Sequence, residues 1–488
     1  MIRWNSSRSG RRISRHLRPT TESLEGRLAL STAFITVTSA SDTPSSDVPA
    51  QVATPGGFTG SADVISLRQA IQLADAVPSG TSVQIDFNIP AGGASPTLEP
   101  TSPLPTITRP VTIDGLSQSQ TMGLEGIEPV LLDGVSAPGA DGLVFSSGAS
   151  GSVVEGLGVT NFGGVGLHFE GASNVQVVND AVGFAYNAQL DTIHIAPNWY
   201  GVEFDGGSGE TINNDVLSGN TIDGLRLIGT SNSTVENTSI GSIDAAGFGY
   251  DSSGWSVGNG GEDHYGSGLY IDNGSYNTVT NDIIANNGTY GILISGPSSF
   301  GNQVTNSKIG TDPTGYLAQP NMTGLEINGG ASYNVASNNV ISGNSWDGVE
   351  ISGSGTIEDE LIGNAIGMSA DLTTQIANWN GIQIDNNAAY AFVYNNTISG
   401  NSSDGVFLAQ TQYDDLEENQ VGLGIYGTPA GNGNYGIILV DGSVDNTIYN
   451  NNIQYNGWEG LITVNAWWDN SFYYNNVVNN GGSNLHLG

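Results

Sequence analysis

Short strands recur along most of the chain, and each opens with glycine followed by alternating apolar and outward-facing residues. Alternation with a period of two predicts a β-strand with one buried face. Many of the repeats are 23 or 24 residues long, which is typical of a β-solenoid whose coils bury their core by stacking. The strands begin at Gly142, Gly166, Gly201, Gly224, Gly268, Gly291, Gly324, Gly348, Gly381, Gly405, Gly436 and Gly460.

A second short strand follows in each repeat, bracketed by asparagine. Examples are NNVISGN from Asn338, NNTISGN from Asn395 and NNIQYN from Asn451. Asparagine tolerates left-handed backbone conformations, and its amide can bond the next asparagine one coil away. The pattern therefore predicts an all-β chain that folds as a right-handed parallel β-helix of roughly 14–15 coils. At about 4.8 Å per coil the rod is about 70 Å long.

The repeat length alternates between short coils of 23 or 24 residues and long coils of 31 to 44. The extra residues enter after the second strand, as in residues 309–324 and 366–381. A loop on every coil would have only about 4.8 Å of room, whereas a loop on every second coil has about 9.6 Å. The spacing predicts a row of loops on one edge of the rod and a bare opposite edge.

The residues before the repeats predict a different organisation. Ser66 can cap a helix over residues 63–76, since Leu67, Ala70, Ile71 and Ala74 share one face. We expect this helix to cap irregular first coils over 83–141, followed by regular coils over 142–488. Residues 38–62 are rich in Ser, Thr, Pro and Gly and predict a disordered linker, and residues 1–37 predict an export segment.

Charge is distributed unevenly, because seven of the eleven basic residues lie within the first 27 positions. The remainder holds four basic and 45 acidic residues, a net charge of −41. Such a surface disfavours nucleic acid, anionic lipid and uronate polymers and leaves neutral glycans or divalent cations as easier partners. No apolar run is long enough to predict a membrane span, and an exported chain without cysteine is stabilised by packing.

Several short motifs resemble known bacterial families. The segment LEGRLALS over 24–31 is similar to the LEPR-XLL N-terminal motif of surface and extracellular proteins, with Gly26 in place of proline. The segments SLRQAI, IDFNIP, LPTITRPVTIDG, PVLLDG and IGTDPTG together resemble CSLREA-type right-handed β-helix proteins, and more broadly NosD-like and pectate-lyase-like β-helices. The resemblance covers residues 63–488 and departs at Ile65 and Arg109. It implies the fold and export but no particular activity.

Candidate chemistry lies on the outward face of the glycine strands, two and four residues after each glycine. Three consecutive coils bring together five ionisable side chains, which could act as general acid and base or bind Ca²⁺: His168, Glu170, Glu203, Asp205 and Arg226. The alternative is that Arg226 only neutralises Glu203 on the neighbouring coil. Glu326 and Glu350 also face each other on adjacent coils, without a cation in register.

Four of the eight tryptophans share one position in the repeat, two residues before the strand glycine. A row of exposed aromatic rings suits stacking on sugar rings, whereas buried rings would only pack the junction between loop and coil. The candidate carbohydrate-binding residues are Trp199, Trp346, Trp379 and Trp458.

These features predict an exported cell-surface or extracellular rod that binds carbohydrate or a neighbouring surface protein. The alternative is a polysaccharide-degrading enzyme, a glycoside hydrolase or a lyase, that uses the acidic face. The lyase is disfavoured because Arg226 and Lys308 are the only basic residues in the regular coils. No cofactor is required, although the acidic face could take Ca²⁺, and an uncapped last coil would allow end-to-end self-association.

Overall fold

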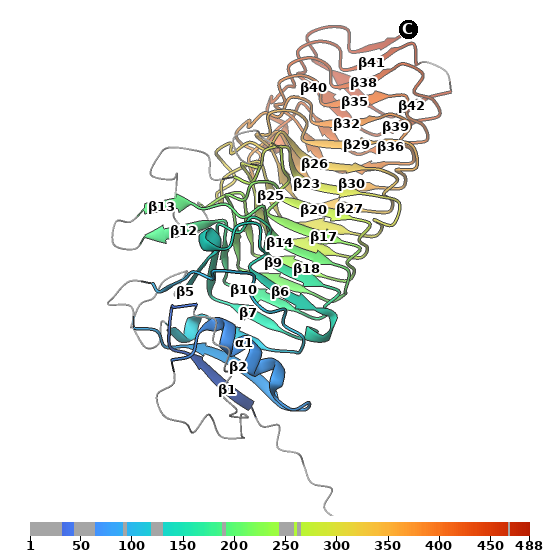
Figure 1. Ribbon diagram of the computed structural model, residues 1–488. Coiled ribbons are helices and arrows are strands. Elements are labelled where there is room, and N and C mark those ends of the chain that lie inside the picture. The colour runs from blue at the N-terminus through green and yellow to red at the C-terminus, as the bar shows by residue number, and fades with distance from the viewer. Residues whose placement is uncertain are drawn as a thin grey trace, which may run out of the picture.

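The computed structural model describes residues 32–42, 64–90, 95–118, 130–187, 192–243, 258–260, 265–466 and 469–488. The chain winds into an elongated rod with the helix α1 (Leu67–Ala76) near one end and the C-terminus at the other (Figure 1). Three parallel sheets of 15, 14 and 13 strands run along it. The structure confirms the predicted right-handed parallel β-helix.

We call the three sheets A, B and C. Each regular coil contributes one strand to each of them and runs first through sheet C, then through sheet A and then through sheet B. Sheet A comprises β1 (Thr32–Val37), β2 (Ser82–Phe87), β4 (Thr112–Asp114), β7 (Val153–Glu155), β10 (Gln176–Val178), β15 (Thr211–Asn213), β18 (Thr234–Glu236), β21 (Thr278–Thr280), β24 (Gln303–Thr305), β27 (Val335–Ser337), β30 (Glu360–Ile362), β33 (Phe392–Tyr394), β36 (Asp415–Glu417), β39 (Thr447–Tyr449) and β42 (Ser471–Tyr473).

Sheet B holds the asparagine-bracketed strands predicted from the sequence. It comprises β3 (Thr97–Leu98), β5 (Val130–Asp133), β8 (Leu157–Thr160), β11 (Ala181–Val182), β16 (Val216–Leu217), β19 (Ser239–Ile240), β22 (Ile283–Ile284), β25 (Lys308–Ile309), β28 (Val340–Ile341), β31 (Ala365–Ile366), β34 (Thr397–Ile398), β37 (Gln420–Val421), β40 (Asn452–Gln454) and β43 (Asn476–Val478).

Sheet C holds the strands that follow the repeated glycines. It comprises β6 (Leu143–Ser146), β9 (Val165–Glu170), β14 (Tyr200–Asp205), β17 (Leu225–Ile228), β20 (Leu269–Asp272), β23 (Tyr290–Ser295), β26 (Thr323–Asn328), β29 (Val349–Ser352), β32 (Ile382–Asp385), β35 (Val406–Ala409), β38 (Ile437–Val440), β41 (Leu461–Val464) and β44 (Leu485–Leu487).

The core is a stack of apolar side chains from the inward face of every strand. On sheet C the rings of Phe145, Phe169 and Phe204 stack with centroids 4.7 and 4.5 Å apart. The strand glycine has a steric role, as Gly348 illustrates: a Cβ there would lie 2.6 Å from the carbonyl oxygen of Gly381. The next coil approaches so closely at this corner that only glycine fits.

Buried asparagine ladders run along the corners of the rod, as predicted. At the corner between sheets B and C, Asn378 Oδ1 accepts from the backbone N and from Nδ2 of Asn344, each at 3.0 Å. Asn378 Nδ2 then donates to Asn401 Oδ1 at 3.1 Å. This repetition satisfies the buried backbone donors of each turn and fixes the register between coils.

The predicted row of loops is present on the corner after sheet B. Long connections follow β11, β25, β31 and β37, whereas those after β16, β22, β28 and β34 are short. The connection after β19 lies largely outside the described residues. The first loop carries the antiparallel hairpin β12 (Phe184–Asn187) and β13 (Thr192–Ile195), which projects from the rod (Figure 1). Short 3₁₀ turns lie at η1 (Gly134–Ser136), η2 (Ser147–Ala149) and η4 (Ile425–Gly427).

The N-terminal end confirms the helix and corrects one boundary. Ser66 caps α1 through a capping box with Gln69, and the predicted apolar face is buried. The predicted export segment, however, includes residues 32–37, which form β1 and pair in parallel with β2. Ala33, Ile35 and Val37 alternate inward, so this strand belongs to the solenoid core. Residues 1–31 and 43–63 lie outside the described residues, and export and the linker stay predictions there.

Candidate functional site

The outward face of sheet C carries the predicted columns in the predicted register. Glu203 pairs with His168 on one side and with Arg226 on the other. Glu326 pairs with Glu350, and Phe407, Ile438 and Ile462 follow toward the C-terminus. This column of sheet C is therefore ionisable on β9, β14 and β17 and apolar on β35, β38 and β41.

Three of the five predicted ionisable residues join a chain of charged contacts. Arg226 Nη1 lies 2.5 Å from Glu203 Oε2, and the other Glu203 oxygen lies 3.6 Å from His168 Nε2. The chain continues from His168 Nδ1 to Asp141 at 3.0 Å and from Arg226 Nε to Asp223 at 3.4 Å. The hydrogen bond between His168 Nδ1 and the accepting carboxylate of Asp141 raises the pKa of the His168 imidazole.

The guanidinium of Arg226 is enclosed as well as paired. It lies 4.3 Å from the ring centroid of Tyr200 and 5.7 Å from that of Tyr270. Glu170 and Asp205 occupy facing positions on the neighbouring strands β9 and β14. Both side chains are exposed and form none of these contacts. The arrangement favours the interpretation that Arg226 neutralises Glu203 and braces the face, because its guanidinium is paired with Glu203 and lies against two tyrosine rings.

Asp141 and Asp223 were not among the predicted site residues. Each lies one residue before a strand glycine and accepts a backbone N–H from the next coil, at Val165 and Ser267 respectively. The recurring Asp-Gly pair in the sequence was the signal that could have found them.

If Arg226 braces this face, replacing it should change the stability of the fold. Arg226→Gln is expected to lower the free energy of unfolding by about 1–3 kcal/mol, because it leaves a mostly buried carboxylate without its partner. Urea denaturation measures this loss, and adding Glu203→Gln should recover part of it. Lys308→Gln is the matched control, since Lys308 forms no ion pair with any described residue. A single variant as stable as the wild type would contradict the bracing role.

The Glu326 and Glu350 side chains do face each other, and their burial favours the protonated form. Glu326 is only 4% exposed; its Oε1 accepts from Asn328 Nδ2 at 2.8 Å, whereas Oε2 meets no donor. Burial raises the pKa of Glu326 to about 9, with Glu350 adding to the effect. Burial also raises the pKa of Glu350 and that of neighbouring Asp347, the latter to about 7. A protonated carboxyl group is both donor and acceptor, so protonation of this pair would supply a donor for the otherwise unpartnered oxygen.

All four predicted tryptophans lie at the surface, 47–54% exposed, on the corner between sheets B and C. The rings of Trp346 and Trp379 stack with centroids 6.4 Å apart and planes inclined by 22°. Trp379 N donates to Trp346 O at 2.6 Å, and the same backbone ladder continues through Ser403 and Asn434 to Trp458. We call this corner, with Trp199, Trp346, Trp379 and Trp458, the Trp row.

An open groove of about 500 Å³ begins at the Trp row and crosses sheet C. It runs from Trp199 past Tyr270 to Tyr290 and Leu293. Its aromatic lining comes from different coils and from different positions in the repeat. The groove was therefore not predicted from columns of equivalent residues.

Metal ligands do not converge in the part of the chain that the structure describes. No three His, Asp or Glu side chains there are grouped so that they could hold one ion. Calcium binding, which the acidic face suggested, stays a prediction. None of the described helices is long and apolar enough to cross a membrane.

Two family models match the chain. The family described as periplasmic copper-binding protein (NosD) matches residues 368–484, and the right-handed β-helix region matches residues 139–309. No curated protein sequence matches. The two models describe β-helix repeats in different parts of the rod.

Solved structures with a similar course of the chain include two polysaccharide-modifying enzymes. One is the A-module of mannuronan C-5 epimerase AlgE4 from Azotobacter vinelandii, at 14% identity over 86% of this chain and 92% of that one, with a TM-score of 0.41. Another is the catalytic unit of a thermostable GH87 α-1,3-glucanase from Streptomyces thermodiastaticus, at 13% identity over 89% and 70%, with a TM-score of 0.45.

Copper, which the name of the first family mentions, does not fit the residues present. Copper sites in proteins use His, Cys and Met ligands. The matched segment 368–484 contains no histidine or cysteine, and its one methionine, Met368, is buried. We derive no copper chemistry for this chain.

Proposed function

We propose that this NosD-like right-handed parallel β-helix repeat protein is an exported rod that binds neutral polysaccharide along its Trp row. The observation that supports the proposal best is the parallel stack of Trp346 and Trp379, with half of each side chain open to solvent. Large aromatic side chains left exposed in register, rather than buried, are typical of binding surfaces. Flat rings spaced along a rod suit an extended glycan whose apolar sugar faces stack on them.

Charge supports a neutral ligand. The chain after residue 27 has a net charge of −41, and Arg226, one of two basic residues in the regular coils, is already paired with Glu203. An acidic polysaccharide would meet repulsion without a compensating cation. A neutral glycan carries no charge for this surface to repel, and its hydroxyl groups and sugar rings can contact polar side chains and aromatic rings.

Export is part of the proposal. It is supported by the arginine-rich N-terminal segment with its LEPR-XLL-like motif and by the periplasmic description of the NosD family. A cell-surface or extracellular location would give the rod access to polysaccharide. Expression of the full chain in a bacterial host, followed by fractionation, tests this: export places it outside the cytoplasm, and retention inside contradicts it.

Binding is tested with Trp346→Ala combined with Trp379→Ala. Each stacked ring contributes roughly 0.5–1.5 kcal/mol, so the double variant should bind about 5- to 150-fold more weakly. Affinity electrophoresis in soluble α-glucan, β-glucan, mannan and xylan measures this effect. Tyr426→Ala is the control, because Tyr426 is an aromatic residue 96% exposed on a loop outside the row. Equal affinity of the double variant and the wild type would exclude the Trp row as the binding site.

A second candidate function is hydrolysis of the bound glycan. It is favoured by the facing carboxyl groups of Glu326 and Glu350, whose pKa values burial raises, because Glu350 lies four residues after Trp346 at the binding edge. A carboxyl group kept protonated at neutral pH can act as a general acid. New reducing ends from the same polysaccharides, lost in Glu350→Gln, would establish an enzyme. Binding without new reducing ends would establish a binding rod.

A further inference from the structure

A second aromatic row lies on the corner between sheets C and A. Consecutive coils are paired at this turn by isolated bridges such as Ser332↔Ile357, Ile357↔Ala389 and Ala389↔Gln412. The residue after each bridge has a positive φ of 56–80°. In chain order these positions are Gly209, Asn232, Tyr276, Gly301, Tyr333, Glu358, Tyr390, Tyr413 and Asp445. Four of the nine are tyrosine, and we call them the Tyr row.

Tyrosine is an unfavourable choice for this backbone. The left-handed region suits Gly, Asn and Asp, whereas a bulky side chain there is an outlier. The next corner of the same coils shows the ordinary solution, since asparagine predominates at its left-handed positions and tyrosine occurs there once, at Tyr474. The asparagines are Asn179, Asn214, Asn237, Asn281, Asn306, Asn338 and Asn395. The fold therefore does not need tyrosine at these turns, and a strained residue that the fold does not need suggests a functional role.

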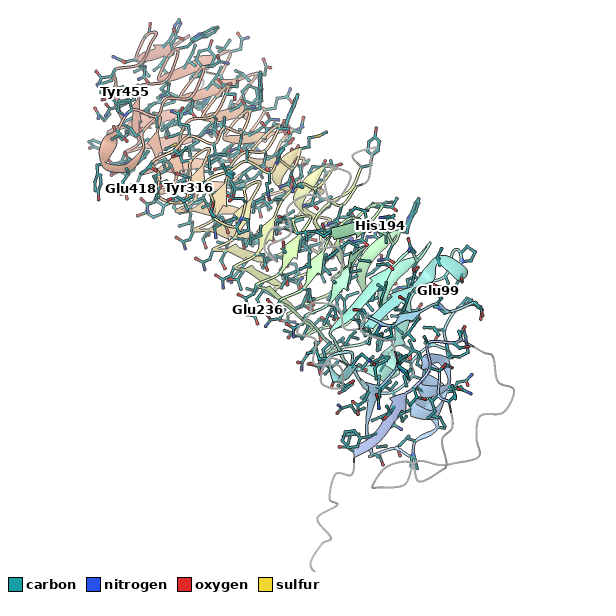
Figure 2. All side chains as sticks on the ribbon, turned by 90° about the vertical axis from the view of Figure 1, so that its left-hand side faces the viewer. Glu99, His194, Glu236, Tyr316, Glu418 and Tyr455 are labelled. Carbon is teal, nitrogen blue, oxygen red and sulfur yellow. The ribbon has the colours of Figure 1, made fainter. Side chains whose placement is uncertain are left out.

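The Tyr row is accessible and regularly spaced. Its side chains are 41–57% exposed, and the rings of Tyr390 and Tyr413 stack with centroids 4.9 Å apart and planes inclined by 16°. Tyr276, Tyr333 and Tyr390 occupy every second coil, a spacing of about 9.6 Å. Figure 2 shows side chains projecting along the rod, with Glu236, the last residue of β18, and Glu418, which follows β36, at its surface.

From this geometry we infer that the Tyr row is a second polysaccharide-binding edge, so that one rod holds two glycan chains and bridges them. The inference rests on the proposed function, since it assigns the same ligand class to both edges of sheet C. The Trp row lies before each sheet C strand and the Tyr row after it, so the two rows occupy different corners. Binding at both makes the rod bivalent.

The surroundings of the Tyr row favour a neutral glycan over a protein partner or a second copy of the chain. Glu358 and Asp445 interrupt the row, so its tyrosines form no continuous apolar patch for a protein to bury. The acidic neighbours also disfavour anionic polymers. Tyrosine offers a flat ring together with a hydroxyl group, which suits a ligand that is both ring-shaped and polar.

Bridging is tested with the triple variant Tyr333→Asn, Tyr390→Asn and Tyr413→Asn in the full chain. Asparagine suits the left-handed backbone, so the variant should fold with an unchanged or higher melting temperature. Light scattering from mixtures with high-molecular-weight neutral glucan, mannan or xylan should rise at intermediate ratios of wild-type protein to polymer. The triple variant should lose this rise while still binding through the Trp row. Glu358→Asn, in the same row, is the control and should scatter like the wild type.

The failure of this inference can be told apart from the failure of the proposed function. In the Trp346→Ala, Trp379→Ala background, residual binding should fall at least tenfold further when the three tyrosines are replaced. Scattering unchanged in the triple variant, or a fall in its melting temperature, would overturn the Tyr row as a binding edge but leave the Trp row untouched. Light scattering by the wild-type protein alone, without polymer, would indicate self-association and would also overturn the Tyr row as a binding edge.

Discussion

Asn364→Leu is expected to lower the free energy of unfolding by about 3–5 kcal/mol. Asn364 is buried, and its Oδ1 accepts from the backbone N of Asn339 at 2.9 Å and from Asn339 Nδ2 at 3.1 Å. Its Nδ2 donates to the carbonyl of Ala336 and to Asn396 Oδ1, both at 2.9 Å. Leucine fills the volume but leaves a buried N–H and a buried C=O without partners, at about 1–3 kcal/mol each.

Guanidinium denaturation with hydrogen exchange measures this loss. Coils of a solenoid contact only their neighbours, so protection should fall first in β28, β31 and β34 and less at the ends of the rod. Asn338→Gly is the matched control: Asn338 is the adjacent asparagine, but it is exposed at a φ of 56° that glycine adopts freely. A leucine variant as stable as this control would show that the ladder contributes register rather than stability.

Raising the pH from 5 to 9 is expected to destabilise the rod and to lower its melting temperature. Burial raises the pKa of Glu326 to about 9, those of Asp180 and Asp282 to about 8, and those of Asp359 and Asp414 to about 7. The unfolded chain loses these protons near pH 4, whereas the folded chain keeps them up to pH 7–9. The stability is therefore fully present below about pH 4 and is lost as the pH rises through the folded pKa values.

Each such group contributes about 1.4 kcal/mol per pH unit over which only the folded chain is protonated. The melting temperature from pH 5 to 9 measures the slope. Glu326→Gln and Asp282→Asn should each flatten it, because the neutral amide no longer titrates. Asp205→Asn, an exposed carboxylate, is the control for the general repulsion of a highly acidic chain. A slope that the buried substitutions leave unchanged would contradict protonation of these groups.

Local repetition explains how much of the fold could be predicted. The strand glycines, the inward alternation and the bracketing asparagines recur at nearly constant spacing, because every coil meets the same neighbours. The register of His168, Glu203 and Arg226 follows from counting residues after each glycine. The Trp row follows in the same way, two residues before it.

Features at the turns were harder to predict, since their distance from the strand glycine varies. The tyrosines of the Tyr row lie eight or nine residues after the preceding glycine, and intervening residues differ from coil to coil. Only the bridges between coils bring them into one column. β1 was not predicted for a related reason: its pairing partner β2 lies far from it in the sequence, outside the regular repeat spacing.

The sequence by itself determined the architecture, the outward columns of sheet C and the Trp row, because these depend on periods of two residues and of one coil. The tertiary structure alone decided that Arg226 is paired with Asp223 as well as Glu203, and that Glu326 is buried against Glu350. It also decided which turns adopt the left-handed backbone. Burial and backbone conformation depend on how neighbouring coils pack against each other, and this packing exists only once the coils are stacked into the rod.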